Sequence, residues 1–503
     1  MSQNLNNLST QKCKQSIELS LFLSVRRTGV LLHPSSFPSS KSGQIGGTLG
    51  HSAYRFIDHL AACGVSVWQM LPLGPTHSDG SPYQCLSSHA GSPRFIDYAL
   101  LPEQAAWCPK GADDVPGALQ GFEQNADAAA KADWARFLTE EAHWLDDYAL
   151  FVALREHSGM RAWFDWPQTL RTREPMALEQ AREQLSERIQ QLRFEQYLFF
   201  TQWFALRDYA HARGVLLFGD MPIYVAHDSA EVWAQPELFS VDAQGQCETV
   251  AGVPPDYFSA TGQRWGNPLY RWERHEADGF AWWKARFATQ LKLFDIIRID
   301  HFRGLEAYWS IPAECETAME GEWVLAPGDA LLTALRESFG RLPVVAEDLG
   351  IITDEVTALR QKHGLPGMRI LQFAFDGGAD NPYLPHNHTP DSVVYTGTHD
   401  NDTTLGWWTS LSAEQQAHIH DYLCGDDLAE AMPWLLIRAA LESVAQLAII
   451  PMQDLLELGA EARMNTPGTT VGNWAWQYDE AQCTPERAKR MREAVALYGR
   501  LPG

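Results

Sequence analysis

Eight short runs of apolar residues, rich in β-branched side chains, recur along the chain and define its organisation. Helical patterns fill the intervals between them, as at 48–64 and at 330–340, where the second pattern ends in a glycine. Short, wholly apolar runs are typical of parallel strands that are buried on both faces. Repeated strand and helix patterns of this kind predict an α/β protein with a (β/α)8 TIM barrel. The predicted strands cover residues 29–34, 65–73, 214–222, 294–300, 342–348, 368–373, 392–400 and 447–454.

Two intervals are too long for a single crossover helix. Residues 74–213 contain two long amphipathic stretches, at 126–157 and 176–211, and residues 223–293 are rich in Pro and Gly and predict loops. Both insertions leave from the carboxyl ends of the second and third strands, so we expect them to form subdomains around the mouth of the barrel. We therefore expect one elaborated catalytic barrel over residues 26–503, preceded by a partly disordered tail at 1–25.

The composition of the 503 residues, 45% hydrophobic and 20% charged, is that of an ordinary globular protein. The formal net charge of −24 argues against nucleic acid and anionic membrane surfaces as partners, and is compatible with a neutral substrate. No stretch approaches the roughly 20 apolar residues of a membrane-spanning helix, and the polar N-terminus does not resemble a signal peptide. The eight cysteines are far apart and lack a C-x-x-C pair, which favours reduced thiols in a cytoplasmic protein.

Three acidic residues stand where predicted strands stop: Asp300, Glu347 and Asp400. The carboxyl ends of barrel strands are where TIM-barrel enzymes carry their catalytic groups. Carboxylates that flank a scissile bond are the machinery of glycosidases. The sequence therefore predicts a glycosidase-type site at this end of the barrel.

The surroundings of these carboxylates suggest different roles. Arg298 lies two residues before Asp300 on the same strand face, and its guanidinium favours the ionised carboxylate that a nucleophile needs. Glu347 follows an apolar run, and desolvation raises a carboxyl pKa, which suits a general acid. Because adjacent strands lie about 4.8 Å apart, we expect the two carboxylates at the roughly 5–5.5 Å separation of a retaining enzyme. Asp400 is placed to bind ring hydroxyls of a distorted sugar.

Other interpretations of these residues are weaker. A single buried Arg–Asp pair is commonly structural, but four charged groups at one barrel mouth favour function, because burying an unpaired charge costs several kcal/mol. A metal site is a rival, and Arg298 argues against it because a cation would repel a divalent metal. The glycine-rich segment 43–50 lacks both phosphate-loop signatures and predicts a plain loop. The possible metal ligands are Asp300, His301, Glu347, His399, Asp400 and Asp402.

Longer motifs extend the pattern beyond the strand ends. Together they closely resemble those of the 4-α-glucanotransferases of glycoside hydrolase family 77, the amylomaltases or disproportionating enzymes of the α-amylase clan. The resemblance covers essentially everything after the first 25 residues or so. The motifs that carry it are LLHPSSFPS at 31–39, WQMLPLGPT at 68–76, SPYQ at 81–84, GDMPIYVAHDSAEVW at 219–233, AGVPPDYFSATGQRWGNPLY at 251–270, RIDHFRG at 298–304, AEDLG at 346–350, GMRILQFAFDG at 367–377, YTGTHDNDTT at 395–404 and MNTPGT at 464–469.

The resemblance implies a retaining double displacement on α-1,4-glucans, with maltooligosaccharides and glucose as substrates and no catalytic cofactor or metal. It makes Asp300 the nucleophile, Glu347 the general acid/base and Asp400 the stabiliser of the transition state. The positions that match sugar-binding residues fall into two groups. Around the sugar at the cleavage point lie Tyr83, Asp220, Arg298 and His399, and Trp265, Asp376 and Asn465 match residues that contact the glucan.

Two functional questions remain open at this point. The loop GPTHSDGSPYQ has Ser78 near the point where some family members carry an aromatic residue, which puts an auxiliary glucan site there in doubt. Hydrolysis by the same carboxylates is the alternative to transfer, because both reactions share the covalent intermediate. A barrel that only binds glucan would be expected to lack a carboxylate, and all three are present.

Overall fold

The computed structural model describes residues 25–38, 47–255, 259–424 and 430–502. The predicted tail at 1–25 falls, but for its last residue, outside the described residues, as does part of the glycine-rich segment 43–50.

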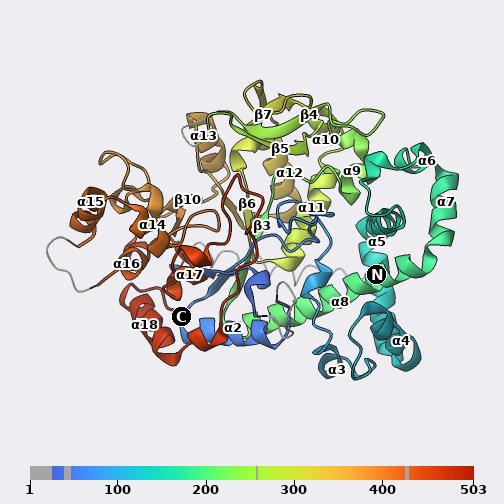
Figure 1. Cartoon of the computed structure of the whole chain (residues 1–503), viewed down its shortest axis with the longest axis horizontal. Helices are drawn as coiled ribbons and strands as arrows, with labels where there is room; N and C mark the ends of the chain where they lie inside the picture. The colour runs from blue at the N-terminus through green and yellow to red at the C-terminus, as the bar shows by residue number, and fades with distance from the viewer. Residues whose placement is uncertain (1–24, 39–46, 256–258, 425–429, 503) are drawn as a thin grey trace.

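Eight parallel strands form one sheet in the order β10-β11-β12-β1-β2-β3-β6-β9, and each predicted apolar run overlaps one of them. The two ends of the sheet approach each other where the Ala346 N–H donates to the Pro366 carbonyl at 2.9 Å, which nearly closes the ring. The predicted (β/α)8 barrel is therefore confirmed, with its strands at the centre of Figure 1. The strands are β1 Arg27–Leu31, β2 Val67–Gln69, β3 Leu216–Met221, β6 Ile296–Ile299, β9 Val344–Ala346, β10 Gly367–Ile370, β11 Ser392–Tyr395 and β12 Leu447–Pro451.

Successive side chains along each strand point alternately to the outside and to the inside of the barrel, and so they form two separate hydrophobic cores. In β6, Ile297 and Ile299 pack in the large cluster outside the barrel, whereas Ile296 faces the barrel interior. Arg298 shares the face of Ile296, so the strand pleat directs it inward. The interior cluster is apolar, and the buried polar groups Asp220 and Arg298 lie near the carboxyl ends of β3 and β6. Its buried members are Leu31, Val67, Leu71, Phe218, Ile296, Val345, Met368, Ile370, Val393, Tyr395, Leu447, Ile449 and Met464.

The helices begin and end at residues that suit helix termini. Thr353 caps α13 through its hydroxyl, which accepts from the Val356 N–H, and Asp354 and Glu355 occupy the positive first turn. The predicted glycine end of α12 is confirmed, since Gly340 takes a φ of 81° directly after it. The helices of the barrel and its C-terminal part are α2 His51–Ala62, α11 Ala281–Leu293, α12 Gly328–Phe339, α13 Asp354–Lys362, α14 Thr404–Ser410, α15 Ala413–Cys424, α16 Trp434–Glu442, α17 Met452–Leu455 and α18 Pro485–Leu497.

The first insertion is helical, as expected, and extends to the right of the barrel in Figure 1. The stretch 126–157 forms the long helix α5. The stretch 176–211 divides at Leu185 into two helices, the second of which, α8, returns the chain to β3. The insertion contains α3 Leu101–Gln104, α4 Val115–Asn125, α5 Ala128–His157, α6 Gln168–Arg171, α7 Pro175–Gln184 and α8 Ser186–His211.

The second insertion contributes half of a small antiparallel sheet of order β5-β4-β7-β8, at the top of Figure 1. Its strands β4 Thr249–Val253 and β5 Gln263–Pro268 come from the segment that predicts loops, together with the short helices α9 Ala230–Ala234 and α10 Trp272–Ala277. The strands β7 Ala307–Pro312 and β8 Glu322–Leu325 follow β6 and were not predicted. They carry Glu, Ser and Trp, and β8 is largely exposed, so no buried apolar run marks them.

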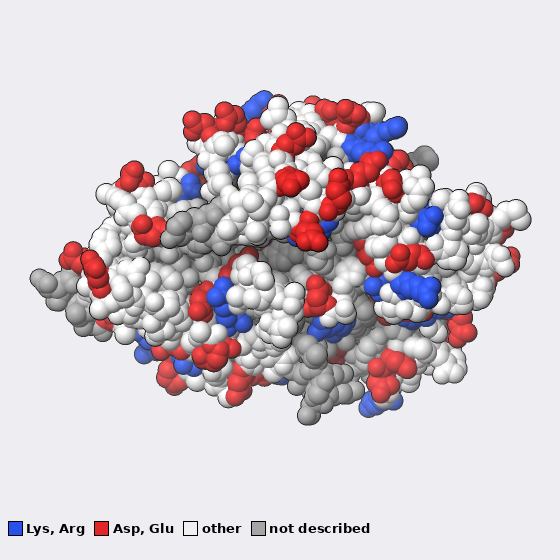
Figure 2. Space-filling view, turned by 45° about the horizontal axis from the view of Figure 1, so that its top comes forward, with Lys and Arg blue, Asp and Glu red and all other residues white. Residues whose placement is uncertain are grey.

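The surface is consistent with the acidic composition. Figure 2 shows Asp and Glu side chains scattered over one whole face, with Lys and Arg in smaller groups between them. The seven cysteines of the described residues are all free thiols, which agrees with the spacing of cysteines along the sequence. None of the helices in the described part of the chain is both long and apolar enough to cross a membrane.

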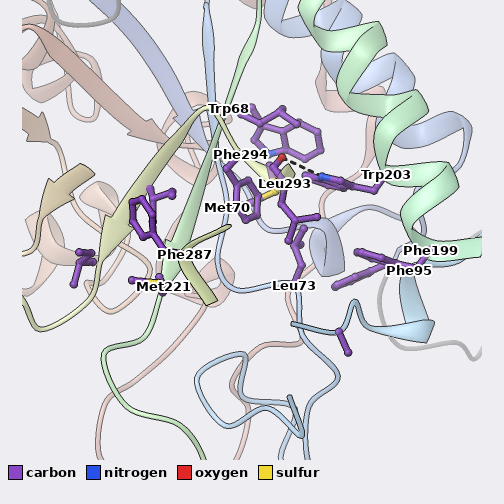
Figure 3. Packing of buried hydrophobic residues seen from close by; sticks show 14 of the residues in the cluster. Trp68, Met70, Leu73, Phe95, Phe199, Trp203, Met221, Phe287, Leu293 and Phe294 are labelled. Atoms are coloured by element: carbon purple, nitrogen blue, oxygen red, sulfur yellow. Dashed lines mark hydrogen bonds between the residues drawn. The ribbon is translucent and has the colours of Figure 1, made fainter. Parts of the chain in front are cut away.

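Packing between the barrel and α8 is tight. The Trp203 indole donates to the Leu293 carbonyl at 3.1 Å, and its ring meets Phe294 edge-on at 5.6 Å between centroids (Figure 3). Phe294 in turn fills the space over Gly219 of β3, where a Cβ atom would overlap its ring. Gly219 is therefore needed for close approach of strand and aromatic layer.

We expect Gly219→Ala to lower the free energy of unfolding by about 1–3 kcal/mol, because the added methyl group overpacks this layer. Thermal unfolding at a fixed scan rate measures the effect. Gly377→Ala is the matched control, since a Cβ there makes only ordinary contacts with Asn381. If the midpoint of thermal unfolding of Gly219→Ala equals that of Gly377→Ala, the packing argument is wrong.

Candidate active site

The predicted site residues come from the carboxyl ends of several barrel strands. Asp220 and Arg298 lie near the ends of β3 and β6, and Asp300 follows β6 directly. Glu347 is the first residue after β9. Tyr83, His399, Asp400 and Asn465 lie in the segments that follow β2, β11 and β12. Because parallel strands end on the same side of a barrel, these side chains converge on one mouth.

A buried arginine joins two of the carboxylates. The Arg298 guanidinium contacts Asp220 Oδ2 at 2.6 Å and Asp300 Oδ1 at 2.8 Å. The Tyr83 hydroxyl donates to the same Asp220 oxygen at 2.8 Å. The Asp300 side chain keeps 29% of its surface exposed, while those of Arg298 and Asp220 are almost wholly buried. Asp300 is thus paired with a fixed cation and still reaches the mouth.

Glu347 has the properties of a proton donor. Desolvation raises its pKa to about 8, against the lowering effect of Arg298 and with a further rise from the Asp300 carboxylate. Its Oε2 accepts from the His301 backbone N–H at 2.6 Å, and its Oε1 accepts from the Leu349 N–H at 3.1 Å. At neutral pH the protonated form predominates, which suits a general acid.

The third carboxylate, Asp400, lies on the wall formed by the segment after β11. The Asn465 amide donates to Asp400 Oδ1 at 2.7 Å, and His399 Nε2 lies 3.3 Å from the same oxygen. Burial lowers the pKa of His399, so its ring is neutral at pH 7. The His399 ring stacks on Tyr83 with centroids 5.3 Å apart, which connects this wall to the Arg298 cluster.

Two predicted sugar contacts, Trp265 and Asp376, come from the second insertion and from the segment after β10. The Trp265 ring meets the His301 ring edge-on at 4.9 Å and so stands beside the residue that binds Glu347. Asp376 lies in the exposed segment after β10, where its carboxylate accepts from Asn381 at 3.1 Å. The structure thus places Trp265 against His301, and Asp376 in the exposed segment after β10.

Three further residues belong to the site. Trp474 packs its ring against Tyr83 and His399, with centroids 6.1 and 5.9 Å apart, and its place in a glycine- and asparagine-containing segment resembles that of Trp265. Arg463 binds the backbone of Asp400, and no local pattern distinguishes this arginine in the sequence. His301, considered in the sequence only as a metal ligand, instead donates its backbone N–H to Glu347.

The electrostatic pattern suits two-step nucleophilic substitution at the anomeric carbon of a sugar. One carboxylate is paired with a cation, a second is protonated, and a third is partly exposed in the segment after β11. This division of roles is that of a retaining glycosidase, in which one carboxylate attacks and the other donates and accepts a proton. Within the described residues, no three His, Cys, Asp or Glu side chains are grouped to hold a metal ion.

Comparisons with known proteins identify the family of the chain. A family model described as 4-alpha-glucanotransferase matches residues 32–482. The 4-alpha-glucanotransferase of Thermus thermophilus is 48% identical over 500 residues, covering 95% of this chain and 99% of that protein. The enzyme of the same name from Synechocystis sp. is 46% identical over 503 residues, covering 95% and 99%.

The fold and the sequence also match a solved structure together. The amylomaltase from Streptococcus agalactiae in complex with acarbose superposes with a TM-score of 0.90 at 37% identity, covering 95% of this chain and 100% of that one. The match therefore extends over the barrel and both insertions, and is not confined to the strand-end motifs. The chain belongs to the 4-alpha-glucanotransferase family.

Proposed function

We propose that this glucanotransferase moves a segment of an α-1,4-glucan to the 4-OH of another glucan or of glucose through a covalent glycosyl-enzyme on Asp300. The observation that carries the proposal is the contrast between two neighbouring carboxyl groups. Asp300 is paired with the buried Arg298 at 2.8 Å, whereas desolvation raises the pKa of Glu347 to about 8. Such a pair supplies a nucleophile and a proton donor at the same pH.

In the first step, Asp300 attacks C1 of the donor sugar while the bond from C1 to the departing O4 breaks. Arg298 holds Oδ1 of Asp300, so we expect Oδ2 to be the attacking oxygen. Glu347 gives its proton to O4, and the cleaved chain leaves with a free 4-OH. The product is an ester between Asp300 and the retained glucan segment.

In the second step, the Glu347 carboxylate takes the proton from the 4-OH of the acceptor. The acceptor oxygen attacks C1, the ester bond breaks and Asp300 is released as a carboxylate. Because two inversions occur at C1, the new bond keeps the α configuration. Glu347 thus returns to its protonated form at the end of each cycle.

The remaining residues bind and shape the sugar in this proposal. Tyr83, with His399 stacked on it, forms an apolar face for the sugar at the cleavage point. Asp400 binds ring hydroxyls and favours the distorted, charge-deficient sugar of the transition state. Residues Asp220 and Asn465 orient these groups, Trp265 is a platform for the next sugar along the chain, and Asp376 is a more distant glucan contact.

Transfer is favoured over hydrolysis by the architecture around the mouth. The helical insertion and the antiparallel sheet both leave from barrel strand ends, and walls of this kind exclude water and bind acceptor sugars. We further propose α-1,4-glucans, maltooligosaccharides and glucose as the substrates, which the acarbose complex of the streptococcal amylomaltase supports. The free thiols support a reducing compartment, and the cytoplasm is our proposal for location.

The first experiment follows products from maltotriose without added metal. Transfer produces a ladder of longer oligosaccharides and free glucose, while the total number of reducing ends stays constant. Chromatography gives the ladder, and a reducing-end assay on the same samples gives the total. Reducing ends that increase at the rate of maltotriose loss would identify water as the acceptor and make the protein a hydrolase.

We expect Asp300→Asn to abolish turnover, because no covalent intermediate forms, and Glu347→Gln to lower kcat on maltotriose by roughly 10²–10⁴-fold, the usual contribution of general acid–base catalysis. Initial rates of glucose release measure both. Asp113→Asn and Glu276→Gln are matched controls at exposed positions, and circular dichroism checks folding. Near-normal turnover in either site variant would refute the role given to that residue.

The raised pKa of Glu347 predicts a pH dependence with a definite sign. Below about pH 8 the acid form is present, and kcat/KM for maltotriose should fall above this value as the proton is lost. An α-maltosyl fluoride donor should lack this alkaline decrease, because fluoride leaves without a proton. Loss of a proton from Asp220, whose pKa burial raises to about 7, would affect both donors equally. An equal alkaline decrease in kcat/KM for maltotriose and for α-maltosyl fluoride would therefore exclude Glu347 as the acid.

A further inference from the structure

Arg463 binds two backbone carbonyls at the edge of the site. It follows the short 3-10 helix η8 Ala460–Ala462, in the segment that comes after β12 and α17. Its Nη2 donates to the Asp400 carbonyl at 2.7 Å, and its Nε donates to the Asn465 carbonyl at 2.8 Å. One guanidinium thus joins two segments that are separated by 63 residues in the sequence.

The same short segment contacts the loop after β11, which carries His399 and Asp400, at two more points. The Asn465 backbone N–H donates to the His399 carbonyl at 3.1 Å, and its side-chain amide donates to Asp400 Oδ1 at 2.7 Å. Asp400 is therefore held at its carbonyl by Arg463 and at its carboxylate by Asn465. With these bonds, residues 463–465 form a clamp on the loop after β11.

Asp400 needs such a clamp because its own surroundings are open. Its side chain keeps 47% of its surface exposed, and packing alone does not fix it. The loop is also held at its two ends, where the Thr396 hydroxyl donates to the Asp454 carboxylate at 2.6 Å and the Gln372 amide donates to the Asp402 carbonyl at 2.9 Å. At Asp400 itself, the hydrogen bonds to other segments of the described chain come from residues 463–465.

We propose that Arg463 is a positioning residue for the transfer reaction, fixing the Asp400 peptide so that the carboxylate faces the sugar at the cleavage point. The inference rests on the role of Asp400 in the proposed function. A displacement of about 1 Å in a catalytic group can cost on the order of 10²-fold in rate. Arg463 acts only through this placement and does not itself touch the reacting atoms.

The test is a set of kinetic measurements on maltotriose. Arg463→Met removes both donors, and we expect kcat to fall about 10- to 100-fold with KM changed less than about threefold. Arg463→Lys keeps a single donor group, and its kcat should lie between that of Arg463→Met and that of the unaltered enzyme. Arg492→Met is the matched control, because Arg492 also donates to a backbone carbonyl, that of Ala61 at 3.4 Å, on an exposed helix surface away from this loop.

A double-mutant cycle with Asp400→Asn separates positioning from general stabilisation. If Arg463 works through the Asp400 carboxylate, Arg463→Met should cause no further decrease in kcat in the Asp400→Asn background. An unchanged kcat in Arg463→Met, or an equal fold-decrease in both backgrounds, would overturn the proposal. If thermal unfolding shows that Arg463→Met does not fold, the same cycle with Arg463→Lys decides.

The cycle also distinguishes this inference from the proposed function. Asp400→Asn with near-normal kcat would refute the role of Asp400 itself and with it the reason for a clamp. An inactive Asp400→Asn enzyme with fully active Arg463→Met would refute the clamp alone.

Discussion

The site depends on the buried guanidinium of Arg298. A cation in the barrel interior is strongly unfavourable unless carboxylates surround it, and here Asp220 and Asp300 do so at 2.6 and 2.8 Å. Strand register sets this geometry, because Asp220 of β3 lies directly opposite Arg298 of β6. A shift of one residue would direct the arginine into the apolar layer outside the barrel. The fold and the chemistry are therefore fixed by the same pairing of strands.

From Arg298 a continuous set of contacts extends around the mouth. Asp220 accepts from Tyr83, Tyr83 stacks on His399, and His399 lies against Asp400. The first two of these contacts join segments that belong to different barrel strands. The third joins His399 and Asp400, which are neighbours in one loop. The arrangement connects Asp300 and Asp400 through one continuous set of contacts, to which the first insertion contributes Tyr83.

The parts of the fold and of the candidate site that could be predicted from the sequence are those that leave a local pattern of residues. The eight strands were predicted because each is a wholly apolar run, and Asp300 and Glu347 were found because a carboxylate at the end of such a run is conspicuous. The strands β7 and β8 were missed because partly exposed strands with Glu and Ser have no such signature. The contact of Arg463 with Asp400 joins loops that are far apart in the sequence. The spacing of apolar residues predicts strands and helices, but it does not predict which loops contact each other. The sugar-binding roles of Tyr83, Asp376 and Asn465 came from the family resemblance, and all three stay predictions.

In the proposed double displacement, the environment of Glu347 balances two opposed demands. The residue must hold a proton in the first step and release it readily enough to act as a base in the second. Desolvation favours the protonated form, whereas the N–H groups of His301 and Leu349 favour the carboxylate. The His301 N–H is aimed at Glu347 by a left-handed backbone with φ of 50°, which costs about 1–3 kcal/mol for a residue other than glycine. That strain has a chemical use, since without this donor the pKa would rise further and the base would be too rarely ionised.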